Sequence, residues 1–192
     1  MIIDALKFLA EEINKYLAQK IGVSTDTRIS LGNVAFLIDS KNPNNALLSL
    51  INVEEDKVSR QHENFTRTVT GVTYKAPPLL LNIYVLFSFN LSEYTESIKW
   101  LSYILQFFQF QPSFNQVTHP ELEKYKIEKL VVELHSMNFE QINHLWSVSG
   151  GKYMPSVMYK VKQLIIDEDA AISEGGFIKD IRFNDKVKPP VS

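Results

Sequence analysis

The sequence contains no cysteine among its 192 residues. This absence removes disulfides, thiolate nucleophiles and thiolate metal sites together, and it fits a reducing compartment. The chain also lacks an excess of positive or negative charge, because 20 basic and 22 acidic residues leave a net charge of -2. A chain so close to neutral has no field that would collect nucleic-acid phosphates. We therefore expect synthesis in the cytoplasm and no nucleic acid as a main partner.

Long hydrophobic runs are missing as well. The longest one, around residues 79–89, is interrupted by Asn82 and Ser88, whereas a membrane-spanning helix needs roughly 18 or more apolar residues. The N-terminal segment carries Asp4 and Glu11 between its apolar positions, which is unlike a secretion signal. We expect neither a membrane span nor a secretion signal.

The chain does have enough apolar material for a core. Hydrophobic residues make up 45% of it, with twelve Phe and eight Tyr, and a chain of this size buries roughly 70% of its unfolded surface. Hydrophobic periodicity predicts helices at residues 2–17, 93–110 and from 139, and strands at residues 28–38, 46–58, 79–90, 129–137 and 157–162. This order predicts an α+β fold with a mainly antiparallel or mixed sheet flanked by helices.

The predicted elements form one domain at residues 1–168. Residues 79–90 are apolar on both alternating sets of positions, which is typical of a central strand covered on two faces. Residues 56–78 are polar and poorly periodic, and we expect an exposed arm or hairpin tip there. Residues 169–192 are expected to form a C-terminal extension that is flexible or ordered by a partner.

The segment at residues 93–110 has an unusually wide apolar face. Tyr94, Ile98, Leu101, Leu105 and Phe108 form one stripe, with Trp100, Ile104 and Phe107 beside it. Ser92 is the expected N-cap. So wide a face must be buried by the sheet, by another subunit, or by both.

Histidine and carboxylate positions offer one candidate for chemistry. Glu133 and His135 share a face of the strand at residues 129–137, where Leu130, Val132 and Leu134 are expected to point inward. The pair, with His144 as a third group, could hold a metal ion or act in a small hydrolytic module. A solvated strand face explains the same alternation, and the sequence has no HExxH motif.

Residues 139–162 contain a helix, a glycine stop and a strand. Phe139, Ile142, Leu145 and Trp146 recur at helical spacing and predict one apolar stripe. Ser136 is a candidate cap for this helix. Gly150 and Gly151 supply the positive φ angles that end a helix, and with Lys152 they lack the spacing and the Ser or Thr of a phosphate-binding loop. Ser149 follows a helix, whereas the serine of a nucleophile elbow lies between a strand and a helix. The segment therefore indicates assembly and no enzymatic activity.

Three groups of residues resemble a known protein family. They are Met1 to Leu9 with Glu12, Asn14, Tyr16 and Leu17; Pro77-Pro78-Leu79 with Leu81 to Tyr84 and Leu86-Phe87; and Phe139 to Trp146 followed by Lys152 to Ser156 and Tyr159 to Val161. Together they resemble the tail-terminator, or cap, proteins of extracellular contractile injection systems. These systems are phage-tail-like particles of the Photorhabdus virulence cassette and antifeeding prophage type.

The resemblance implies a structural protein and no cofactor. Its subunits would form a homo-oligomeric ring, a hexamer in such particles, on the end of the inner tube protein and the sheath protein, and so fix particle length. The fold would resemble that of phage tail terminators. The particle, assembled in the cytoplasm, would then be released or retained. An assembly adaptor of the particle is an alternative to the cap.

Several aromatic and basic residues are candidates for contacts with the neighbouring subunit, the tube or the sheath. The candidates on the helix at residues 93–110 are Trp100 and Phe107. The remaining candidates lie in the arm and the C-terminal extension: Arg60, Arg67, Lys75, Phe177 and Arg182.

Overall fold

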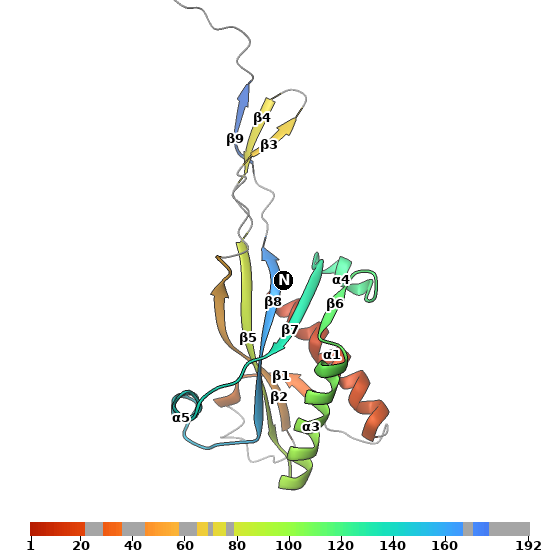
Figure 1. Cartoon of the computed structure of the whole chain (residues 1–192), viewed down its shortest axis with the longest axis vertical. Coiled ribbons are helices and arrows are strands. Elements are labelled where there is room, and N and C mark those ends of the chain that lie inside the picture. The colour runs from red at the N-terminus through yellow and green to blue at the C-terminus, as the bar shows by residue number, and fades with distance from the viewer. Residues whose placement is uncertain are drawn as a thin grey trace, which may run out of the picture. The chain divides into compact units, whose positions relative to one another are not determined.

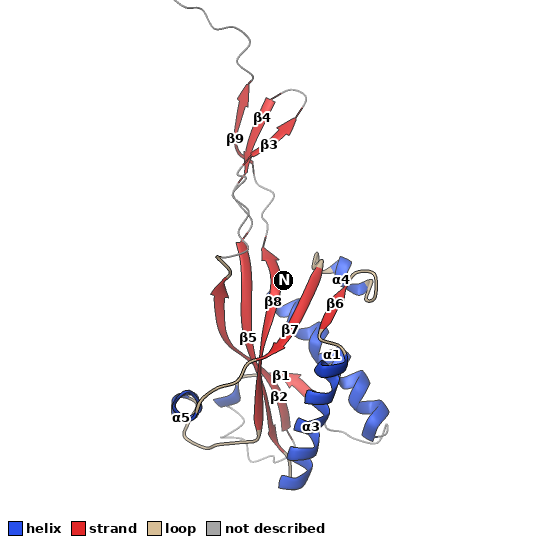
Figure 2. Cartoon of the chain, viewed as in Figure 1, coloured by secondary structure: helices blue, strands red, loops and turns tan. Residues whose placement is uncertain are grey.

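The fold is described from a computed structural model, for residues 1–21, 29–35, 45–57, 65–68, 71–75, 79–166 and 171–176 (Figures 1 and 2). Contacts divide the chain into two compact units. The first consists of Met1–Arg60 and Leu79–Ile166, and the second of Gln61–Pro78 and Asp167–Ser192. The extent of the predicted domain remains a prediction.

The first unit is a six-stranded sheet with helices on both faces. Its strands, in the order in which they lie side by side, are β1 (Ile29–Leu31), β2 (Asn45–Glu55), β5 (Leu79–Asn90), β8 (Ser156–Ile166), β7 (Lys129–Leu134) and β6 (Ser113–Asn115). β1 pairs with β2 in parallel and all the other neighbours are antiparallel. The helices are α1 (Ile2–Ile21), α3 (Tyr94–Phe110), α4 (Glu121–Lys124) and α5 (Phe139–Val148). The predicted α+β fold with a mixed sheet is confirmed.

The main core fills the face of the sheet that α1 and α3 cover (Figure 1). Aromatic rings pack against one another here: Phe8 lies edge-on to Phe114 with ring centroids 5.4 Å apart, and Phe108 lies tilted against Tyr159 with centroids 4.6 Å apart. Such pairs stabilise a core beyond the area that they bury. The predicted helix at the N-terminus is confirmed as α1, whose buried stripe includes Leu6, Leu9 and Ile13.

β5 is the interior strand that its two-sided apolar pattern predicted. Its odd-numbered residues, such as Val85 and Phe87, lie in the main core, and Leu86 lies in a second, smaller cluster on the opposite face. That second cluster packs under α5 and is made of Val34, Leu86, Trp146, Met154 and Met158. The two faces of the sheet therefore have separate cores.

Details of α3 differ from the prediction. The helix buries Ser97, Trp100, Ile104, Phe107 and Phe108, while Tyr94 and Ile98, which we expected on the main buried stripe, are exposed. The predicted cap Ser92 is wrong, because the N-cap is Glu93 and makes no side-chain capping bond. α1 and the sheet occupy one side of α3 and bury the stripe of Trp100, Ile104 and Phe107. The other stripe is buried at Phe108, partly buried at Leu101 and Leu105, and exposed at Tyr94 and Ile98.

Two strand predictions also need correction. Leu134 was expected to point into the core but is 55% exposed, because β6 pairs only with residues 129–131 of β7 and leaves the end of the strand at an open edge. In the segment predicted as strand at residues 28–38, β1 ends at Leu31, and Val34 and Ala35 have helical backbone. Gly32 and Asn33 have no regular structure, and residues 28 and 36–38 of that segment lie outside the described part.

The second unit contains a three-stranded antiparallel sheet. β3 (Phe65–Thr68) and β4 (Gly71–Lys75) form a hairpin, and β4 also pairs with β9 (Ala171–Gly176). The hairpin lies in the predicted arm at residues 56–78, and β9 lies in the predicted C-terminal extension. These two segments, about 100 residues apart in the chain, therefore meet in one sheet.

Candidate assembly surfaces

α5 has a complete cap at each end, which stabilises the helix itself. The Gln141 backbone N–H donates to Oδ1 of Asn138 at 2.8 Å, and the Asn138 N–H donates to Oε1 of Gln141 at 3.0 Å. This reciprocal capping box replaces the predicted Ser136 cap. At the other end, the Gly151 N–H donates to the Trp146 carbonyl at 2.7 Å, with positive φ at Gly150 and Gly151. The predicted glycine stop is confirmed as a Schellman motif.

Most of α5 is nevertheless exposed. Trp146 is the one buried residue of the helix, whereas Phe139 at its start is 91% exposed. Tyr153, in the loop after the helix, packs its ring against Trp146 with centroids 5.7 Å apart and is 65% exposed. Phe139 was placed on the apolar stripe by its spacing alone, and its exposure could not be read from that spacing.

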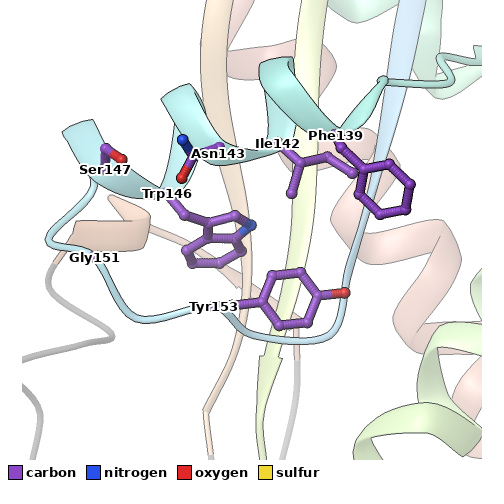
Figure 3. Close-up of a pocket in the computed structure, with 7 residues that line it drawn as sticks. All are labelled: Phe139, Ile142, Asn143, Trp146, Ser147, Gly151 and Tyr153. Atoms are coloured by element: carbon purple, nitrogen blue, oxygen red, sulfur yellow. The ribbon is translucent and has the colours of Figure 1, made fainter.

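A groove runs between α5 and the loop that follows it (Figure 3). It has a volume of about 240 Å³ and is lined by Phe139, Ile142, Asn143, Trp146, Ser147, Gly151 and Tyr153. None of these side chains is charged. The buried Nε1–H of Trp146 has no acceptor among the described residues, and an unpaired buried donor is costly. We call this surface the α5 groove.

A second uncovered surface lies on α3. Tyr94, Ile98, Leu101 and Leu105 follow one another at positions i, i+4, i+7 and i+11, so they form a line along the helix. Tyr94 is 66% exposed and Ile98 39%, while Leu101 and Leu105 are partly buried against the main core. We call this line the outer ridge of α3.

Glu133 and His135 do not form a joint site. Oε2 of Glu133 forms an ion pair with Nζ of Lys162 at 2.6 Å. The His135 ring packs edge-on against that of Tyr84, with ring centroids 5.0 Å apart. His144 lies on α5. Within the described ranges, no group of three or more His, Asp or Glu side chains is placed to hold a metal ion. The geometry does not favour the metal-binding or hydrolytic alternative.

The strand face around these residues carries compensated charge. Oε2 of Glu54 accepts from the Tyr84 hydroxyl at 2.7 Å and from Nζ of Lys160 at 3.0 Å. The hydrogen bond from Tyr84, followed by that from Lys160, holds the pKa of Glu54 below its usual range. Paired charges of this kind form a solvated, polar strand face.

The predicted contact residues are not brought together by the described structure. Trp100 and Phe107 are buried in the main core under α3, so the fold itself accounts for their apolar character. Arg67 lies on β3 and Lys75 on β4. Arg60, Phe177 and Arg182 lie outside the described residues.

No helix among the described residues is both long and apolar enough to cross a bilayer.

A comparison with curated protein sequences finds no match. Similar solved structures include the following two. One, described as the PVC sheath/tube terminator of an extracellular contractile injection system in its extended state, aligns with a TM-score of 0.66 and 13% identity over 100% of this chain. The other, the tube-terminating cap of the anti-feeding prophage, aligns with a TM-score of 0.57 and 14% identity over 89% of this chain.

The chain spans 65% of the first of these proteins and 58% of the second. At such low identity the two structures establish a shared fold. The family of the chain is established by a sequence comparison: the family model of the Pvc16 N-terminal domain matches residues 4–180. This match confirms the resemblance that the sequence motifs indicated, and the chain belongs to the Pvc16 N-terminal domain family.

Proposed function

We propose that this protein is a structural cap that terminates the inner tube and sheath of a contractile injection particle and so fixes its length. The observation that carries the proposal is the alignment of the whole chain with a protein described as a sheath/tube terminator, within a family whose model covers most of the sequence. The similar fold of a tube-terminating cap supports it. The cap acts without catalysis and without a cofactor.

The cap works as a closed homo-oligomeric ring, a hexamer, that binds the inner tube protein and the sheath protein. Tyr94 and Ile98 on α3 and Phe139 beside the α5 groove leave apolar side chains exposed, and this supports self-association, because large contiguous apolar patches are rare on monomers. Among the described residues, β3 and β9 form the outer edges of the sheet of the second unit, and a tube or sheath subunit can add a strand there. Assembly takes place in the cytoplasm and the ring stays on the particle.

Particle length is the direct test. Deleting the gene should produce tubes and sheaths of variable length, and supplying the protein from a plasmid should restore one length, measured by electron microscopy of purified particles. A second measurement is antibody labelling, which should mark one end of each particle. Unchanged particle lengths in the deletion strain would refute the cap. An assembly adaptor would instead be missing from purified intact particles.

A further inference from the structure

A group of polar side chains around His119 joins α1 and the end of α3 to the turn between β6 and α4. Nε2 of His119 lies 3.2 Å from Nε2 of Gln111, the C-cap residue of α3. The same ring nitrogen lies 3.5 Å from Oε2 of Glu12 on α1. Nδ1 of His119 lies 2.9 Å from Oγ1 of Thr118. We call these four residues the His119 cluster.

The His119 cluster is largely shielded from water. The side chains of His119 and Glu12 are each 13% exposed. The rings of Phe8 and Phe114 pack edge-on against the imidazole, with centroids 5.5 and 5.2 Å from its own. Hydrogen bonds and charge interactions are stronger in such surroundings than in bulk water. A change in the charge of His119 therefore acts directly on its few fixed neighbours.

The contacts assign the hydrogen of the neutral imidazole to Nδ1. The amide nitrogen of Gln111 is a donor only, so Nε2 of His119 accepts from it. Nδ1–H then donates to Oγ1 of Thr118, whose hydroxyl donates to the carbonyl oxygen or to Oδ1 of Asn115, both at 3.2 Å. In this arrangement the lone pair of Nε2 and Oε2 of Glu12 face each other without a hydrogen between them.

Protonation of His119 changes which neighbour Nε2 binds. A charged imidazole carries a hydrogen on both nitrogens, so Nε2–H donates to Oε2 of Glu12 and can no longer accept from Gln111. The amide of Gln111 must then turn its oxygen toward the ring or leave it. Histidine is the side chain whose charge ordinarily changes between about pH 5 and 8. A fall in pH therefore moves the bond of the turn from the end of α3 to α1.

The charged groups around the His119 cluster come from α1 and α4. Nζ of Lys15 pairs with Oε1 of Glu12 at 2.5 Å and lies 3.7 Å from Oε1 of Glu121. The lysine thus occupies the other oxygen of Glu12 and leaves Oε2 facing the imidazole. From Trp100 to Pro120 the sequence contains no Asp, Glu, Lys or Arg, so most of α3 and all of β6 add no charge. Two carboxylates and one ammonium group surround the site, and a positive imidazole balances them.

We propose that the His119 cluster is a pH-sensitive contact within the fold, in which the neutral imidazole binds Gln111 and the protonated imidazole binds Glu12. Because charged hydrogen bonds are stronger than neutral ones, the turn at residues 115–120 is held more firmly at acidic pH. Val117 in this turn is 91% exposed, and Phe110, next to Gln111, is 85% exposed. The exchange of partners therefore acts on a segment with accessible apolar side chains. The inference concerns the fold and does not depend on the proposed cap function.

NMR reads both the hydrogen positions and the firmness of the turn. Proton–nitrogen correlation spectra of the imidazole should show a hydrogen on Nδ1 alone at about pH 8 and on both nitrogens at about pH 5. Amide protection factors, which correct for the intrinsic effect of pH on exchange, should rise about tenfold at Val117, Thr118 and His119 between these pH values. A hydrogen bond to a charged group contributes a free energy of that order. The amides are informative because each donates to Asn115.

Glu12→Gln is the decisive variant, because it keeps the size of the side chain and removes the charge that the protonated imidazole binds. It should abolish the rise in protection at acidic pH. The matched control Glu121→Gln removes the other carboxylate near Lys15 and should retain the rise. Gln111→Ala removes the donor to the neutral imidazole and should allow its hydrogen to move to Nε2 at about pH 8. Exposed His144 on α5 is the internal reference for histidine titration, and thermal melting verifies each fold.

Three outcomes would overturn the inference. The first is a hydrogen on Nε2 of His119 in the native protein at about pH 8, because Glu12 is then the partner of the neutral ring already. The second is protection of the turn that does not change with pH. The third is a rise in protection that persists in Glu12→Gln. If that variant does not fold, the hydrogen positions in the native protein and in Gln111→Ala decide. None of these outcomes bears on the cap function, which particle length tests separately.

Discussion

The two faces of the six-stranded sheet are covered to very different extents. On one face α1 and α3 bury a continuous cluster that includes Phe8, Phe87 and Phe114. On the other face α5 contributes one buried side chain, Trp146, to a cluster of five residues. The helices on both faces are amphipathic, so the faces differ in how much of the helices' apolar surface the fold itself buries.

One face of the sheet therefore stabilises the fold, and the other leaves apolar surface accessible to a partner. The main core buries most of the large aromatic side chains, and removing any of them leaves a cavity. α5 packs on its face of the sheet through few apolar contacts, chiefly that of Trp146, and the caps at its two ends stabilise the helix itself. Rings such as Phe139 stay exposed. A helix anchored in this way can offer its remaining surface to a partner at little cost to the fold.

The largest effect is expected from Phe87→Ala. Phe87 is fully buried and its ring contacts those of Phe108 and Tyr159. Truncation should lower the free energy of unfolding by about 4 kcal/mol through lost burial and the cavity that remains. Chemical denaturation followed by tryptophan fluorescence measures this change. A loss below about 1 kcal/mol would mean that the main core relaxes around the site, which would break the contrast between the faces.

Trp146→Ala should cost less, about 3 kcal/mol, because Trp146 borders an open groove and belongs to a small cluster. Circular dichroism in a denaturant series measures the stability of this variant without relying on the deleted fluorophore. The matched control is Phe139→Ala on the same helix, which should change stability by less than about 0.5 kcal/mol because the ring is exposed. If Trp146→Ala proves as costly as Phe87→Ala, the face under α5 is a full core and the comparison fails.

The sequence predicts elements best where one periodicity dominates. The apolar positions of α1 repeat at helical spacing on one stripe, and β5 is apolar on both sets of alternating positions. The same logic located the end of α5, since Gly150 and Gly151 adopt positive φ angles that other residues rarely take. Local chemistry decides these features, so they could be predicted.

Features that depend on neighbours could not be predicted in this way. α3 has two adjacent apolar stripes, and only contact with the sheet and α1 decides that Trp100 and Phe107 are buried while Tyr94 is exposed. The exposure of Leu134 depends on the short length of β6. The pairing of β4 with β9 joins segments about 100 residues apart, which no local pattern encodes.

The candidate surfaces could be predicted only in part from the sequence, because they too depend on which neighbouring elements cover a side chain. Spacing placed Phe139 and Trp146 on one apolar stripe of a helix, but it does not tell which of the two is buried. Trp100 and Phe107 were chosen as contact residues for their aromatic character, which a core uses equally well. The absence of charge between Trp100 and Pro120 is the sequence signal that would have pointed to the outer surface of α3.

The smallest effect is expected from Glu54→Gln on the polar part of the face that also carries α5. Hydrogen bonds from Tyr84 and then Lys160 lower the pKa of Glu54 in the folded protein. A lowered folded pKa means that the stabilisation is present above the unfolded pKa and is lost as pH falls through the folded one.

Melting temperatures of the native protein and the Glu54→Gln variant should therefore differ slightly at neutral pH and converge as the pH falls to about 3. The difference should stay below those of Phe87→Ala and Trp146→Ala because the carboxylate is exposed and screened by solvent. Glu96→Gln is the control, since the Glu96–Lys99 pair at 3.5 Å is also exposed but lacks a tyrosine donor. A difference for Glu54→Gln that persists unchanged at low pH would show that the side chain acts through packing and that its charge is irrelevant, because a protonated carboxyl and an amide are then nearly equivalent.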